Sequence, residues 1–157
     1  MRSLYKKSLM IQTIDRLKLI GKNIEDLKTI SAYCQDSIVK IRDLAYLKKN
    51  KVFIIMLSRF MWEDIEKGVL RNYKRIKSVL KFNFIENVLV KNINQHQKDR
   101  NLELLTIKAY SNQKNMYEIN LIFSGNGILL LKSEEIDVML DDQEYYWEVK
   151  YSPKHKL

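Results

Sequence analysis

The chain has 157 residues, of which 46% are hydrophobic and 30% charged, and its formal net charge is +9. These totals are typical of one soluble folded domain and argue against a disordered chain. Cys34 is the only cysteine, which excludes an internal disulfide and is typical of a reducing, cytoplasmic compartment. No apolar run approaches the roughly 20 residues that cross a bilayer, so we expect no membrane association.

The positive charge has two interpretations. Basic proteins often bind nucleic acid. However, 21 of the 28 basic residues are lysine, and the chain also holds 18 isoleucines and 12 asparagines, a bias that an AT-rich genome produces by itself. Arginine, whose planar fork suits phosphate contacts, is scarce. Genome composition is therefore the preferred explanation, and nucleic-acid binding is the alternative.

We interpret residues 1–14 as a flexible extension and residues 15–157 as a single globular domain. The extension has basic residues but only a broken apolar stretch, which does not fit a secretory signal. Met10 is an alternative start of translation.

The first predicted elements are a short strand over 17–20 and a helix that begins after Asn23. Asn23 is a suitable N-cap, and Asp26 stands three residues later as its partner. Four residues recur at helical spacing and predict a buried face: Leu27, Ile30, Ser31 and Cys34. Cys34 is interpreted as a small buried side chain rather than a nucleophile, since no histidine lies near it in the sequence.

A β-hairpin follows. Residues 37–47 and 52–62 are rich in Ile, Val and Leu, and a polar turn of residues 48–51 separates them. In the second strand, the residues that point to either face are apolar up to Leu57, which predicts that both faces are covered.

Residues 71–82 alternate as a further strand. Ile76, Leu80 and Phe82 point one way, and the opposite face carries the candidate nucleic-acid residues Arg71, Tyr73, Arg75, Lys77 and Lys81. Cations can neutralise phosphates and an aromatic ring can stack on a base. The preferred interpretation is an exposed or edge strand that charge keeps soluble.

More strands are predicted over residues 84–93, 102–110, 116–123 and 128–131. Ser133, Glu134 and Glu135 resemble a helix N-cap with acids in the first turn, so a short C-terminal helix is expected to pack on the sheet. The aromatic end, residues 145–151, is expected to dock on the domain. His96 has no second histidine or cysteine at ligand spacing, so no metal and no cofactor are expected.

These elements predict an α+β fold with a mostly antiparallel sheet forming a roll or small barrel. One N-terminal helix and one short C-terminal helix complete it. The order of the elements is similar to that of a pleckstrin-homology domain, an analogy that carries no information about a ligand.

The helix region contains Glu25-Asp26-Leu27, Ile30-Ser31-Ala32 and Gln35-Asp36. This pattern resembles that of an uncharacterised alphaproteobacterial family, a domain of unknown function. Its members have an EDL…ISA…QD helix, found here from Glu25 to Asp36, and a later strand ending in Asn-Arg-Phe-Asp-Trp-Glu. The second motif stands here as residues 58–63, with Ser58 and Met61 departing from it. The similarity covers roughly residues 17–155. It implies a bacterial cytosolic protein and no particular reaction.

A KVGD-like turn of the family also matches at Asp43, with Arg42 in place of its glycine. The matched positions contain the candidate binding residues Gln35, Asp36, Asp43, Arg59, Trp62 and Glu63. An acid pair with an arginine can bind a carboxylate or phosphate, or perform acid–base chemistry. The preferred interpretation is a buried network in which Arg59 pairs with Asp36 or Glu63 and fixes the helix to the hairpin. Trp62 is more simply a core or rim residue.

Three functions remain open. The leading hypothesis is a non-enzymatic binding or adaptor module whose partner is another protein. The second is a basic protein associated with RNA or the ribosome, and the third is a small-molecule enzyme built on Asp36, Asp43, Arg59 and Glu63. The oligomeric state is not predicted.

Overall fold

The computed structural model describes residues 16–66, 73–112 and 114–153. Within these residues ten strands form one sheet: β1 Lys18–Gly21, β2 Ser37–Lys40, β3 Leu44–Leu47, β4 Val52–Phe60, β5 Tyr73–Phe82, β6 Ile85–Lys91, β7 Asn101–Ser111, β8 Tyr117–Phe123, β9 Ile128–Ser133 and β10 Val138–Val149. There are two α-helices, α2 Ile24–Cys34 and α3 Trp62–Glu66, and three 3₁₀ turns, η1 Ile41–Asp43, η2 Lys48–Asn50 and η3 Ser124–Asn126. The predicted α+β class is confirmed.

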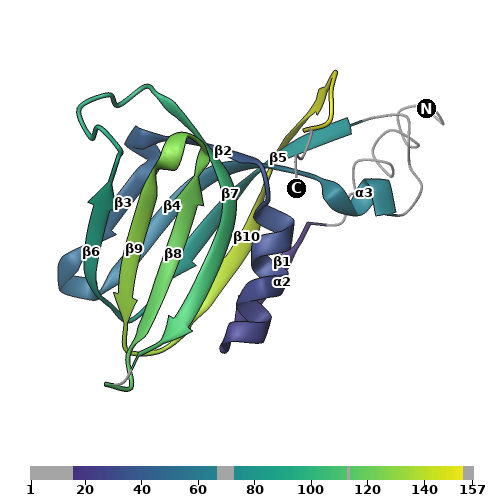
Figure 1. Cartoon of the computed structure of the whole chain (residues 1–157). Coiled ribbons are helices and arrows are strands. Elements are labelled where there is room, and N and C mark those ends of the chain that lie inside the picture. Colours follow the sequence, from purple (N-terminus) through teal and green to yellow (C-terminus); the bar gives the residue numbers. More distant parts are fainter. Residues whose placement is uncertain (1–15, 67–72, 113, 154–157) are drawn as a thin grey trace.

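The strand order is β1-β10-β5-β4-β2-β7-β8-β9-β6, and β3 pairs with the first half of β4. These pairings are antiparallel, and the sheet is not closed, so the described residues form no closed barrel. In Figure 1 α2 lies alongside β7 and β1, which agrees with its contacts to both strands. No helix of the described residues is long and apolar enough to cross a membrane.

The predicted N-terminal helix is confirmed as α2. The Asn23 side chain accepts a hydrogen bond of 2.8 Å from the Asp26 amide, and Asp26 in turn accepts one of 2.9 Å from the Lys22 amide. These bonds satisfy two amides near the start of the helix. The four residues that predicted a buried face are all buried, so this face closes the core beneath the sheet.

The hairpin is confirmed for β3 and β4, but residues 37–47 are not one strand. The Ile41 amide donates to the Arg100 carbonyl and the Arg42 amide to the Lys98 carbonyl, at 3.1 and 3.0 Å. These two bonds turn the chain as η1 between β2 and β3. The second expectation, that β4 is covered on both faces, is also only half met. Phe53, Ile55 and Leu57 are buried, whereas the opposite face is partly exposed.

The predicted C-terminal helix is wrong. Residues 138–149 form β10, the longest strand, which pairs with β5 on one side and β1 on the other. Burial alternates from Val138 through Leu140 to Asp142, a period of two that belongs to a strand. In the sequence, Ile136, Met139 and Leu140 also stand at helical spacing, but so short an apolar run does not distinguish a helix from a strand. The described chain therefore does not end in a helix as a pleckstrin-homology domain does.

A single hydrophobic core joins the elements. It draws on α2 and on strands from both halves of the sheet, from Val39 and Phe53 to Leu121 and Leu131. A core of this kind requires the sheet to curve around its buried face. β10 lies between β1 and β5 in the sheet, and this pairing positions the buried polar residues described next.

Candidate functional site

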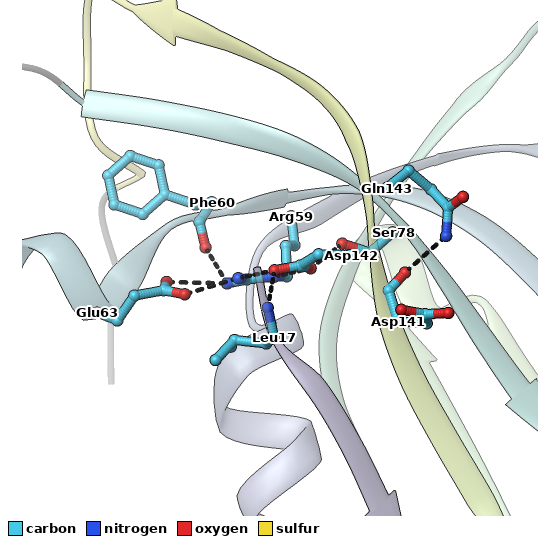
Figure 2. Close-up of polar contacts among 8 residues, drawn as sticks. All are labelled: Leu17, Arg59, Phe60, Glu63, Ser78, Asp141, Asp142 and Gln143. Carbon is cyan, nitrogen blue, oxygen red and sulfur yellow. Dashed lines mark hydrogen bonds and ion pairs between the residues drawn. The ribbon is translucent and has the colours of Figure 1, made fainter. Parts of the chain in front are cut away.

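The most prominent polar cluster surrounds Arg59. This residue lies near the end of β4 and is fully buried. Its guanidinium group bonds Glu63 through two hydrogen bonds of 2.9 and 2.6 Å, and Asp142 through two of 2.8 and 2.7 Å. Figure 2 shows Arg59 between these two carboxylates, with a fifth bond to the Phe60 carbonyl at 3.3 Å.

These bonds leave Arg59 with no spare donor. A guanidinium group carries five N–H groups, and five bonds are formed. The Asp142 carboxylate also accepts bonds from the Ser78 hydroxyl at 2.5 Å and the Leu17 amide at 2.8 Å. We call Arg59, Glu63, Ser78 and Asp142 the Arg59 network. It ties β4, α3, β5 and β10 together.

The charges in the Arg59 network are mutually stabilised. Burial disfavours the ionised form of Asp142, but the Arg59 and Ser78 hydrogen bonds outweigh it and hold the pKa of Asp142 below its ordinary value. Burial likewise opposes the charge of Arg59, yet its two carboxylates hold the pKa of Arg59 above its ordinary value. Burial raises the pKa of the nearby Cys34 thiol to about 12, so this thiol is neutral and no nucleophile.

The prediction that Arg59 pairs with Glu63 is confirmed, and its pairing with Asp36 is not found. The structure adds Asp142 and Ser78, which lie 83 and 19 positions along the chain from Arg59. One signal in the sequence pointed to Asp142. Asp142 follows Val138 and Leu140 at alternate positions, which in a strand share one face. A buried carboxylate requires a buried cation or several hydrogen-bond donors.

Gln35 and Asp36 lie at the junction of α2 and β2, where they contribute backbone groups. The Gln35 carbonyl accepts a 2.9 Å bond from the Trp62 indole, and the Asp36 carbonyl accepts one of 3.2 Å from Arg75. Asp36 is buried and has a left-handed φ of 60°, a conformation that aspartate tolerates better than most residues. Together these contacts fix the end of α2 to α3 and β5.

Asp43 does not join this cluster. It ends η1, and the next residue, Leu44, pairs with Ile55 on β4, four positions before Arg59. Four residues of strand span roughly 13 Å. The six candidate binding residues therefore divide into the Arg59 network, the α2–β2 junction with Trp62, and a separate Asp43.

The candidate nucleic-acid residues are only partly a free surface. Arg71 lies outside the described residues, and Tyr73, Arg75, Lys77 and Lys81 share one half-buried face of β5. Arg75 donates to the Ser58 carbonyl at 2.9 Å, and its guanidinium carbon stands 5.9 Å from the centre of the Phe60 ring. Burial lowers the pKa of Arg75, which is thus a structural contact as well as a cation.

A groove lies elsewhere, between α2 and β7. It has a volume of about 730 Å³. One wall is the α2 face that carries Lys28, Ser31 and Ala32, and the other is β7 from Glu103 to Tyr110. We call this the α2–β7 groove. Sequence reasoning missed it because the groove depends on how a helix and a strand approach each other.

The described residues contain no group of three or more His, Cys, Asp and Glu side chains placed to hold a metal ion. The Arg59 network is buried and internally paired, whereas the α2–β7 groove is open and holds neither histidine nor cysteine. The Arg59 network and the α2–β7 groove are therefore separate parts of the molecule, and no residue of the network lines the groove.

Comparison with known proteins gives one match. The model of the family described as "Protein of unknown function (DUF2948)" matches residues 17–155. No curated protein matches the chain, and no solved structure matches it. The resemblance to a family without known function is confirmed, and its alphaproteobacterial origin stays a prediction. The chain belongs to the DUF2948 family, whose function is unknown.

Proposed function

We propose that this protein is a non-enzymatic binding module that acts as an adaptor for another protein in a bacterial cytosol. The observation that supports the proposal is the α2–β7 groove. Its lining is mainly apolar and also includes charged side chains, as in many recognition sites. We further propose that the curved sheet is a roll, a scaffold that presents α2 and β7 rigidly.

The lining of the groove suits a peptide better than a reaction. Ile24, Leu105 and Tyr110 supply apolar surface, and Leu105 and Tyr110 are 39% and 52% exposed. Ser31 and Thr106 already bond each other at 3.3 Å. Large apolar side chains that face solvent beside a groove gain free energy when a partner covers them.

An enzyme built on Asp36, Asp43, Arg59 and Glu63 has less support. A general acid or base must reach a substrate with an available proton or lone pair. Arg59 and Glu63 are buried in mutual pairing, and Asp43 lies apart from them. The Arg59 network is better explained as a structural link between strands.

RNA binding is a second candidate because of one observation on β10. Trp147 pairs with Arg75 in the sheet register, and Tyr145 lies 5.3 Å from Trp147 between ring centres. Tyr145 is 65% exposed. The basic face of β5 therefore lies beside aromatic side chains of β10. Bases of a single-stranded nucleic acid can stack on such rings.

The test is affinity capture of partners from the native bacterium with four baits. The baits are the wild-type protein, Ala32→Trp, Thr29→Trp and the double variant Lys77→Glu, Trp147→Ala. Ala32→Trp fills the α2–β7 groove, and Thr29→Trp is the matched control on an exposed part of α2 outside the lining. Each capture is repeated after nuclease treatment, at low and at high salt.

If the protein is an adaptor, the wild-type bait captures a protein partner even after nuclease treatment and at high salt. The Ala32→Trp bait no longer captures this partner, and the Thr29→Trp bait still does. RNA binding gives the opposite pattern. Capture then disappears with nuclease, weakens steeply with salt, and depends on Lys77 and Trp147 rather than on Ala32. That second pattern would refute the adaptor proposal.

A further inference from the structure

We infer that the α2–β7 groove binds an extended peptide of a partner protein, which pairs with β7 as an additional strand. The inference rests on the proposed function and specifies the mode of recognition. Strand addition needs a sheet edge with unpaired backbone groups, room for a chain beside it, and side chains that select the peptide. The groove meets each of these requirements.

The edge of β7 beside α2 has no strand partner after Leu104. β2 pairs with β7 only from Asn101 to Leu104, and the Asp36 amide then donates to the Leu104 carbonyl at 2.7 Å as the chain turns into α2. The other edge of β7 continues to pair with β8 as far as Ser111. Among the described residues, the stretch 105–111 is therefore paired on one edge only.

A side-chain contact shows which backbone groups face the groove. The Ile107 amide donates to the Ser31 hydroxyl at 2.9 Å, so this N–H points toward α2 and away from β8. Backbone groups alternate between the two edges of an antiparallel strand. The N–H groups of Ala109 and Ser111 consequently face the groove, together with the carbonyls of Ile107 and Ala109. The Ser31 hydroxyl already accepts the hydrogen bond of the Ile107 amide, so this N–H group is not available to a peptide.

The dimensions and charges define the peptide. An 11-residue helix such as α2 is about 16 Å long, which matches about five residues of extended chain. The Asp36 amide bonds the Leu104 carbonyl, so Glu103 lines the end of the groove where α2 ends. Lys28 precedes Ser31, which bonds Ile107, so Lys28 and Lys108 line the groove toward its other end. Both lysines and Glu103 are exposed, and the ion pair between Lys28 and Glu25 is a surface pair of little strength. The expected peptide has apolar residues in its middle and an acid at the lysine end.

The probe is a displayed library of random nine-residue peptides, selected against the full-length protein. We select peptides that no longer bind the Ala32→Trp variant but still bind the Thr29→Trp variant. These peptides are synthesised, and their affinity is measured by fluorescence anisotropy. Each peptide is then N-methylated at one residue at a time. Loss of one backbone hydrogen bond is expected to weaken binding about tenfold.

Strand addition predicts a period of two in this scan, with weakening at alternate residues and little effect between them. It also predicts that binding slows hydrogen exchange at the Ala109 amide. A Lys108→Glu substitution should weaken peptides with an acidic end and favour the same peptides with that acid changed to lysine.

Two results would overturn the inference. Groove-dependent binding without the alternating effect of N-methylation would refute strand addition but leave the adaptor proposal standing, since the groove would then recognise side chains alone. Selection that yields no peptide sensitive to Ala32→Trp would remove both strand addition and the assignment of the groove.

Discussion

At the scale of single residues, Arg59 carries the largest buried charge interaction. Its guanidinium group bonds two carboxylates and a carbonyl inside a region where Arg59 and Asp142 are 0% and 4% exposed. Burying such a network costs desolvation energy that the bonds roughly offset, whereas removing one partner leaves a charge that nothing compensates. The Arg59 network is therefore expected to be sensitive to any single substitution.

Replacing Arg59 by methionine leaves Glu63 and Asp142 buried without a cation. We expect the free energy of unfolding in urea to fall by about 3–5 kcal/mol. Arg59→Lys should not restore it, because an ammonium group cannot fork between two carboxylates. Lys77→Met, on the other face of neighbouring β5, serves as a control with an expected change within about 0.5 kcal/mol. Equal effects for both methionine variants would contradict the structural role of Arg59.

Stability should also depend on the ionisation of Asp142. Its pKa in the folded protein lies below the unfolded value of about 3.9, so the ionised carboxylate stabilises the fold above that value. The contribution is lost as the pH falls through the folded pKa. Urea unfolding should therefore show the wild type more stable than Asp142→Asn at pH 7, with the difference shrinking below about pH 4.

The neighbouring, partly exposed Asp141 provides the control for this measurement, as Asp141→Asn should remain close to the wild type across the range. A constant difference between the wild type and Asp142→Asn from pH 7 to pH 3 would mean that Asp142 acts through its shape rather than its charge.

At the scale of elements, local signals identified α2 correctly. The Asn23 side chain accepts a hydrogen bond from the Asp26 amide, and the Asp26 carboxylate accepts one from the Lys22 amide. Leu27, Ile30 and Cys34 supply the buried face. The same kind of reasoning failed at residues 133–140. There a cap-like serine and acids suggested a helix, but pairing with β5 and β1 imposed a strand. Capping is a local preference, and two flanking strands override it.

The cap itself can be tested. Asn23→Ala removes the acceptor for the Asp26 amide and is expected to lower the free energy of unfolding by about 1 kcal/mol. Asn23→Asp, which keeps an acceptor, should retain stability close to the wild type, as measured by thermal and urea unfolding followed by circular dichroism. A loss of similar size in both variants would show that the Asn23 side chain does not act as a cap.

At the scale of the whole molecule, the core joins both halves of the sheet and α2 in one cluster. A single core predicts cooperative, two-state unfolding. Urea transitions followed by far-ultraviolet circular dichroism and by tryptophan fluorescence should therefore coincide. Trp62 reports on the contact between α3 and the end of α2, and Trp147 reports on β10. Separate transitions would therefore reveal a part of the fold that unfolds independently.

The sequence by itself determined the α+β class, α2 with its buried face, the β3–β4 hairpin and the choice of Asp36 or Glu63 as the partner of Arg59. Each of these depends on neighbours in the chain or on short-range periodicity. The similarity of residues 17–155 to one family was likewise readable from motifs.

Only the tertiary structure decided the rest. Asp142 bonds Arg59 although the two residues are 83 positions apart in the chain. β10 is a strand because it pairs with β1 on one edge and with β5 on the other. The α2–β7 groove exists because β2 stops at the level of Leu104 while β7 continues. Long-range pairing sets these features, and no local preference encodes where one strand ends beside another.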